Sequence, residues 1–160
     1  RQDSVGGDID PNQDRGPRRL YLGRMSSTET PATAARPPTP YGLVGGEAMV
    51  RRIADRFYDI MDSAPEAARI RALHAEDLSA VRDRLFEFLS GWLGGPPLYF
   101  QRPDHKCIMS AHRPFAIGPA ERDEWMMCMR RALKDCGVPA EMRTLLDAAF
   151  LRLAEAFRNR

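Results

Sequence analysis

The side chains best suited to chemistry in this sequence are three histidines and three cysteines: His74, His105, His112, Cys107, Cys128 and Cys136. His112 is the most constrained of them, because Pro114 follows two residues later and disfavours helix in the residue before it. The sequence therefore predicts a short turn of helix near 106–111 that stops at this histidine. An imidazole at a constrained helix end, facing an apolar pocket, could serve as an axial iron ligand. A single histidine at a helix end is more often a capping or surface residue, so both interpretations stay open.

His105 and Cys107 lie close to His112 and suggest two other kinds of site. A zinc site is disfavoured because the paired Cys-x-x-Cys or His-x-x-x-His spacing of structural zinc sites is missing. A Cys107–His112 catalytic pair is disfavoured because no third group that would orient the imidazole is evident. Gly94-Gly95 lacks the Lys-Ser/Thr pair of a phosphate-binding loop. None of these enzyme hypotheses is supported by the spacing.

Tyr58 and Trp125 are the other informative side chains, since both fall near the apolar face of an expected helix. A buried tyrosine or tryptophan needs a partner for its O–H or N–H. Spacing alone favours two ordinary core aromatics with polar tips bonded to backbone. The residues by themselves therefore predict a helical bundle with a polar pocket, and no more.

Four main helices are expected to position these residues. Apolar residues recur at three- and four-residue spacing between Gly46 and Ser63, from about Ser79 to Gly94, from about Pro119 to Gly137, and from Pro139 onward. Pro139 is expected at the first helical position of the last one. The inward residues expected for that helix are Met142, Leu145, Leu146, Ala149 and Leu153. The stretch after Gly94 is expected to be irregular up to the short turn before His112. No segment alternates with period two, so the predicted fold class is all-α.

The composition limits both size and partners. A chain of 160 residues with 43% hydrophobic and 29% charged residues allows one domain with a buried core. The net charge of +2 argues against nucleic acid as the main partner. No apolar run of membrane-spanning length and no secretory apolar stretch occurs, so no membrane partner is expected. Three cysteines without a disulfide-scaffold pattern are consistent with reduced thiols, and the expected location is cytoplasmic.

The first 40 residues differ from the rest in composition. They hold six of the 13 prolines and almost no periodic apolar pattern, which predicts a disordered tail over 1–40 and a globular domain over 41–160. Met25-Ser26-Ser27 is typical of a native N-terminus, so residues 1–24 are expected to be upstream or artefactual sequence.

Several motifs in the domain resemble the group II truncated haemoglobins. The matching segments are Gly45-Gly46, Asp55-Arg56-Phe57-Tyr58, His74-Ala75-Glu76-Asp77-Leu78, Phe88-Leu89-Ser90-Gly91-Trp92-Leu93-Gly94-Gly95-Pro96, Ala111-His112-Arg113-Pro114-Phe115-Ala116-Ile117-Gly118, Glu121-Arg122-Asp123-Glu124-Trp125 and Cys128-Met129. The resemblance covers roughly 41–157. It departs at Asp104-His105-Lys106, where the family often has Gly-His-Pro, so His105 is not expected to be a ligand.

The resemblance implies a truncated globin, a two-over-two helical sandwich around haem b. It implies that His112 is the proximal iron ligand. Residues expected to stabilise a bound ligand are Tyr58, His74 and Trp125. Residues expected to contact the cofactor are Val81, Leu85, Phe115 and Met129.

The function implied by the resemblance is binding of oxygen and other diatomic gases such as CO and NO. The alternative is a haem redox enzyme, a peroxidase or a nitric-oxide-detoxifying enzyme. Such an enzyme would need a separate reductase, since the sequence offers no reductase domain. The oligomeric state is left open between monomer and homodimer.

Overall fold

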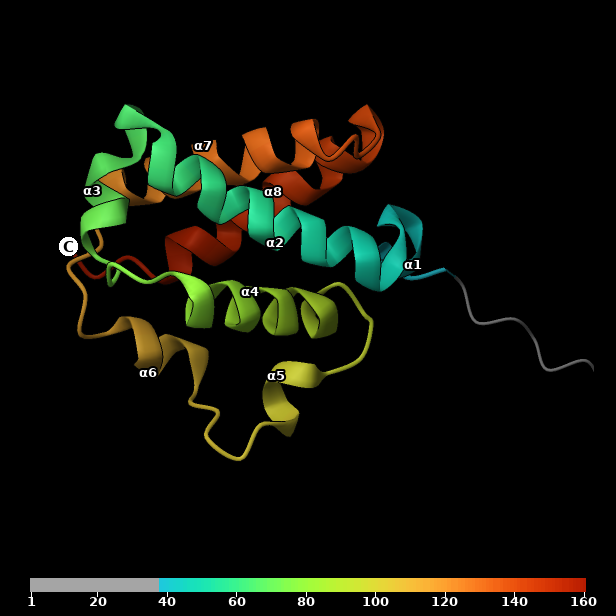
Figure 1. The fold of residues 1–160 in the computed structure, drawn as a ribbon, viewed down its shortest axis with the longest axis horizontal. Helices are drawn as coiled ribbons and strands as arrows, with labels where there is room; N and C mark the ends of the chain where they lie inside the picture. Colours follow the sequence, from blue (N-terminus) through green and yellow to red (C-terminus); the bar gives the residue numbers. More distant parts are fainter. Residues whose placement is uncertain (1–37) are drawn as a thin grey trace, which may run out of the picture. The chain divides into compact units, whose positions relative to one another are not determined.

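The computed structural model describes residues 38–160, and every element of regular secondary structure in this part of the chain is a helix (Figure 1). The all-α prediction is therefore confirmed. The predicted disordered tail, apart from its last residues, and the expected start at Met25 lie outside the described residues. No helix in the described part is long and apolar enough to cross a membrane.

Four long helices build the domain: α2 (Gly46–Ser63), α4 (Ser79–Trp92), α7 (Pro119–Asp135) and α8 (Ala140–Ala156). Five short elements connect or precede them: α1 (Pro40–Val44), the 3-10 turn η1 (Pro65–Ala67), α3 (Ala68–Ala72), α5 (Leu98–Gln101) and α6 (Ile108–His112). The four predicted main helices are thus confirmed in number and order.

Local sequence explains where the long helices begin and end. Gly45 and Gly46 have φ angles of 117° and 68°, a left-handed conformation that glycine adopts without strain, and α2 follows directly. α2 ends at Ser63 because Pro65 disfavours helix in the residue before it. At the start of α7 the Gly118 N–H donates to the Glu121 carboxylate at 2.8 Å, which satisfies one of the amide groups left free at a helix N-terminus.

The long helices pack in two layers around a common core. α2 contacts both α4 and α7, and α7 contacts α8, so that α2 and α4 form one layer and α7 and α8 the other. The largest fully buried side chains come from all four helices and include Phe57, Leu89, Met129 and Phe150. Figure 1 shows α5 and α6 on the side of α4 that faces away from α2. On this side only short helices cover α4.

α4 carries apolar side chains on two of its faces. Phe86, Leu89 and the buried hydroxyl of Ser90 face the core, and the Ser90 O–H donates to the Phe86 carbonyl oxygen at 2.8 Å. Val81 and Leu85 are only half-buried and point to a cavity described below. A helix that divides a core from a cavity needs apolar side chains on both sides.

Three further predictions need correction. The stretch after Gly94 was expected to be irregular, but it contains α5, where the Tyr99 hydroxyl donates to the Lys106 carbonyl oxygen at 2.9 Å. Pro139 precedes the first residue of α8 instead of occupying it. Leu145 was expected to be buried but is 69% exposed, because the buried row of α8 runs through Leu146 and Phe150, one residue further along.

Two leucines provide a matched test of this core. Leu133 on α7 is 2% exposed, whereas Leu145 on α8 is 69% exposed. Leu133→Ala is expected to lower the free energy of unfolding by about 2–5 kcal/mol, because it leaves a cavity in a packed interior. Leu145→Ala is expected to change it by less than about 0.5 kcal/mol. Urea unfolding followed by circular dichroism measures both, and a similar loss for the two variants would contradict this assignment of the core.

Candidate functional site

A largely apolar cavity of about 550 Å³ lies among α4, α6, α7 and α8 and the corner after α3. Seven of the eight residues predicted from the sequence line it: Tyr58, His74, Val81, Leu85, His112, Phe115 and Trp125. Their sequence positions span 68 residues from Tyr58 to Trp125, so the fold brings together groups from five different segments. The eighth, Met129, does not reach the cavity and is fully buried in the core between the layers.

His112 ends α6 with its ring held from two directions. Its Nδ1 lies 2.7 Å from the Ile108 carbonyl oxygen. Because a carbonyl oxygen can only accept, Nδ1 carries the hydrogen and donates it, which leaves Nε2 with a free lone pair. The ring also lies flat against Phe157, with centroids 4.1 Å apart and planes at 3°. The imidazole is thus fixed in tautomer and in plane, as metal-binding histidines usually are.

Tyr58 and Trp125 bring two hydrogen-bond donors to the cavity. Both pack against Phe57, whose ring centroid is 4.9 Å from that of Tyr58 and 5.3 Å from that of Trp125. Tyr58 is only 6% exposed, and burial raises the pKa of its hydroxyl well above the ordinary value, so the group stays protonated. Neither the Tyr58 O–H nor the Trp125 N–H has a hydrogen-bond partner within residues 38–160. Tyr58 is buried and Trp125 is partly buried, and both donors remain available to a ligand in the cavity.

His74 lies beside Tyr58, with ring centroids 5.7 Å apart. Its Nδ1 donates to the Ile70 carbonyl oxygen at 2.8 Å, so the neutral ring has an acceptor at Nε2. Burial lowers the pKa of His74 below the ordinary value of 6.5, and the positive charge of Arg71 lowers it further, against the opposing effect of the Ile70 bond. At neutral pH the ring is therefore uncharged.

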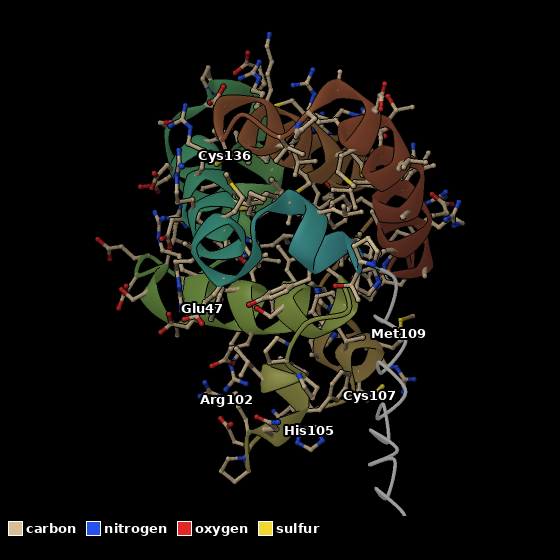
Figure 2. All side chains as sticks on the ribbon, turned by 90° about the vertical axis from the view of Figure 1, so that its right-hand side faces the viewer. Glu47, Arg102, His105, Cys107, Met109 and Cys136 are labelled. Atoms are coloured by element: carbon tan, nitrogen blue, oxygen red, sulfur yellow. The ribbon has the colours of Figure 1, made fainter. Side chains whose placement is uncertain are left out.

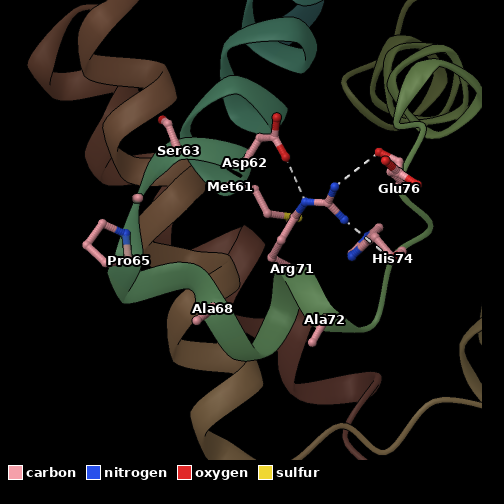
Figure 3. A pocket seen from close by; sticks show the side chains of 10 residues that line it. Met61, Asp62, Ser63, Pro65, Ala68, Arg71, Ala72, His74 and Glu76 are labelled. Atoms are coloured by element: carbon pink, nitrogen blue, oxygen red, sulfur yellow. Dashed lines mark hydrogen bonds and ion pairs between the residues drawn. The ribbon is translucent and has the colours of Figure 1, made fainter.

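Arg71 fixes the corner that carries His74 (Figure 3). Its guanidinium donates to the Asp62 carboxylate at 2.8 Å and to the carbonyl oxygens of Ala75 and Glu76 at 2.9 and 3.1 Å. These bonds tie the chain after α3 to the end of α2. An open groove of about 600 Å³ runs along this corner, and His74 is the residue that lines both this groove and the inner cavity.

The other candidate residues lie away from the cavity. Figure 2 shows His105, Cys107 and Met109 together at the edge formed by α5 and α6, with Cys136 at the far end of the domain. Cys107 is exposed, and Cys136 is buried. Within the described part of the chain no three His, Cys, Asp or Glu side chains gather closely enough to hold a metal ion.

Sequence reasoning missed several cavity residues. The charged ones are Arg84, Glu121 and Arg122, and the aromatic ones include Phe157 and Tyr99. Tyr99 had no helical period to reveal it, because α5 is four residues long. Arg84 follows Val81 by three positions on α4, a spacing that could have indicated it.

A model of the family described as bacterial-like globin matches residues 39–159. A group 2 truncated haemoglobin of Bacillus subtilis is 32% identical over 107 residues, which cover 67% of this chain and 78% of that protein. Among solved structures, the group II 2-on-2 haemoglobin of Agrobacterium tumefaciens has 42% identity and a TM-score of 0.74, and the match covers 79% of this chain and 98% of that one. A truncated oxygen-avid haemoglobin of Bacillus subtilis has 30% identity and a TM-score of 0.68, over 76% and 99% of the two chains.

The lowered pKa of His74 predicts how stability depends on pH. A base whose folded pKa lies below its unfolded value stabilises the fold fully above the unfolded value, here 6.5. That contribution is lost as pH falls through 6.5 towards the lower folded pKa. His74→Phe, which cannot be protonated, is therefore expected to lose less stability than the wild type between pH 7.5 and pH 5.5.

Urea unfolding at the two pH values measures this difference. His105→Phe, a substitution at an exposed histidine outside the cavity, serves as the matched control. An equal pH dependence for the wild type and His74→Phe would refute the proposed effect of burial.

Proposed function

This chain belongs to the bacterial-like globin family, whose members bind haem and oxygen, and from this premise we propose that His112 is the proximal ligand of the haem iron in a gas-binding protein. The observation that carries the proposal is the hydrogen bond from His112 Nδ1 to the Ile108 carbonyl oxygen. It leaves the Nε2 lone pair free beside an apolar cavity. Neutral imidazole in this tautomer is the form that ligates iron.

The cavity also fits haem in its chemistry. Val81, Leu85 and Phe115 supply apolar contacts for a porphyrin. Arg84 and Arg122 also line the cavity and would exchange their ion pairs with Asp104 and Glu155 for the porphyrin carboxylates. The three cysteines do not form the Cys-x-x-Cys-His motif that attaches haem covalently, which supports haem b held without a covalent bond. Haem, when bound, supplies an iron atom that takes diatomic gases such as oxygen, carbon monoxide and nitric oxide.

Tyr58 and Trp125 are proposed to hold a gas ligand in place. Both carry donors that have no partner in residues 38–160. A hydrogen bond to a group that carries negative charge contributes about 1.5–3 kcal/mol, more than a bond between neutral groups. The indole N–H can only donate, so Trp125 favours a ligand that carries negative charge. Two such donors would slow the release of oxygen strongly.

His74 is proposed to modulate this pair. In its neutral form Nε2 carries only a lone pair, so His74 adds no donor to those of Tyr58 and Trp125. When His74 takes up a proton, Nε2–H becomes a third donor towards the cavity. Since burial lowers the pKa of His74, this third donor is present only below the ordinary histidine range.

An absorption spectrum tests the proximal assignment. The protein reduced with dithionite and exposed to carbon monoxide is expected to show a Soret band that shifts sharply on CO binding. His112→Ala is expected to lose or alter that band, because the other histidine that lines the cavity, His74, lies in the corner after α3 and not on α6. His105→Ala, close in sequence but outside the cavity, is expected to match the wild type. A wild-type spectrum without a Soret band after haem addition would overturn the proposal.

The chain holds two tryptophans, which makes a matched test of the distal donor possible. Trp125→Phe keeps an aromatic ring but loses the N–H, and it is expected to speed oxygen release by about ten- to a hundredfold. Trp92 stacks on Phe150 at 4.7 Å and does not line the cavity, so Trp92→Phe is expected to leave the rate unchanged. Stopped-flow spectroscopy measures the oxygen dissociation rate of both variants. An unchanged rate for Trp125→Phe excludes the indole as a donor.

A further inference from the structure

The short helix α6 cannot fix its own position. It has five residues, none of them buried, and helices of this length are not stable alone. The hydrogen bond from His112 to the Ile108 carbonyl oxygen lies within the same helix, so it orients the ring relative to α6 only. The direction of His112 relative to the cavity must therefore be set by contacts that come from outside α6.

Tyr99 of α5 holds the chain before α6 through the Lys106 carbonyl oxygen, and the contacts to the chain after α6 come from the residues after α8. Figure 1 shows this segment passing beside the connection between α6 and α7. The Asn159 side chain donates through Nδ2 to the Phe115 carbonyl oxygen at 2.8 Å and accepts at Oδ1 from the Ile117 N–H at 3.1 Å. The Asn159 backbone N–H donates to the Ile117 carbonyl oxygen at 3.0 Å. One residue thus makes three hydrogen bonds to a connection more than 40 positions earlier.

Asparagine suits this position better than aspartate or alanine would. Its amide carries a donor and an acceptor on one rigid group, and the two bonds reach a C=O and an N–H two residues apart. Aspartate would keep the acceptor for Ile117 but would turn a negative oxygen towards the Phe115 carbonyl. Alanine would lose both bonds and leave the N–H of the buried Ile117 without this partner.

Phe157, two residues before Asn159, completes the contact. Its ring stacks on His112 at 4.1 Å and 3°, and both residues line the cavity. A flat contact of this kind restricts rotation of the imidazole about its bond to the main chain. Asn159 holds the connection after α6, and Phe157 holds the plane of the ring.

We propose that Phe157 and Asn159 are positioning residues of the proximal site, which hold His112 at a fixed tilt and rotation towards the iron. The inference rests on the proposed function of His112. It predicts that these two residues, through their contacts with His112 and with the connection after α6, influence the strength of the iron–histidine bond and the rate of gas binding.

Resonance Raman spectroscopy of the reduced, ligand-free protein tests the proposal, because the iron–histidine stretching band reports the bond directly. Phe157→Leu and Asn159→Ala are expected to shift or broaden this band and to change the rate of carbon monoxide association by at least about threefold. Phe157→Tyr keeps the flat ring and is expected to restore both. Arg160→Gln changes the neighbouring side chain, whose bond is to the Asn159 carbonyl oxygen, and serves as the control.

Hydrogen exchange of the Ile117 amide supplies a readout that does not depend on the iron. Asn159→Ala is expected to exchange this hydrogen about tenfold faster, while Asn159→Asp, which keeps the acceptor, is expected to protect it. If both variants lower only the melting temperature and leave the Raman band and the carbon monoxide rate unchanged, the positioning role is refuted. A wild type without an iron–histidine band would instead refute the proposed function of His112.

Discussion

A cavity of about 550 Å³ inside a domain of roughly 120 residues is the constraint on which the rest of this structure depends. Protein interiors are close-packed, and side chains on opposite walls of a cavity of this size make fewer dispersion contacts with one another than side chains in a packed core do. The cavity therefore needs a rigid frame. The layers of α2 with α4 and α7 with α8 supply it, with fully buried Phe57 and Phe150 behind the cavity wall. Both rings also contact Trp125, so the same core that supports the wall fixes a cavity side chain.

The polar groups of the cavity follow a simple division. On one side His112 uses its Nδ1–H internally, which leaves a lone pair. On the other side Tyr58 and Trp125 keep their hydrogens unpaired. The His112 lone pair can therefore coordinate a metal ion. The Tyr58 and Trp125 donors can form hydrogen bonds to a ligand of that metal. His74 belongs to neither group in its neutral form, since its Nδ1–H is already used on the Ile70 carbonyl oxygen. The neutral His74 ring offers a lone pair at Nε2, and the protonated ring offers a hydrogen-bond donor there.

The sequence predicts the long helices well because each depends on local features such as Gly45, Pro65 and Pro119. It does not resolve which of two adjacent apolar rows is buried, and the exposure of Leu145 illustrates this, because the choice depends on where α7 packs against α8. The cavity residues were identified through family resemblance, since period and composition alone could not distinguish Tyr58 from a core aromatic. The stacking of Phe157 on His112 joins residues 45 positions apart and leaves no mark in either local sequence. Asn159 likewise stands in a polar stretch that gave no signal.

Only the short helices α5 and α6 cover the outer side of α4 in the described part of the chain, and this affects the order in which the helices of the domain assemble. The core shared by α2, α7 and α8 involves no residue of α6, and α6 itself buries none of its side chains. The main frame of the domain therefore does not need α6 in order to assemble. The residues after α8 contact His112 and the connection that follows it, so we expect α6 and these residues to close over the cavity after the frame of long helices has formed.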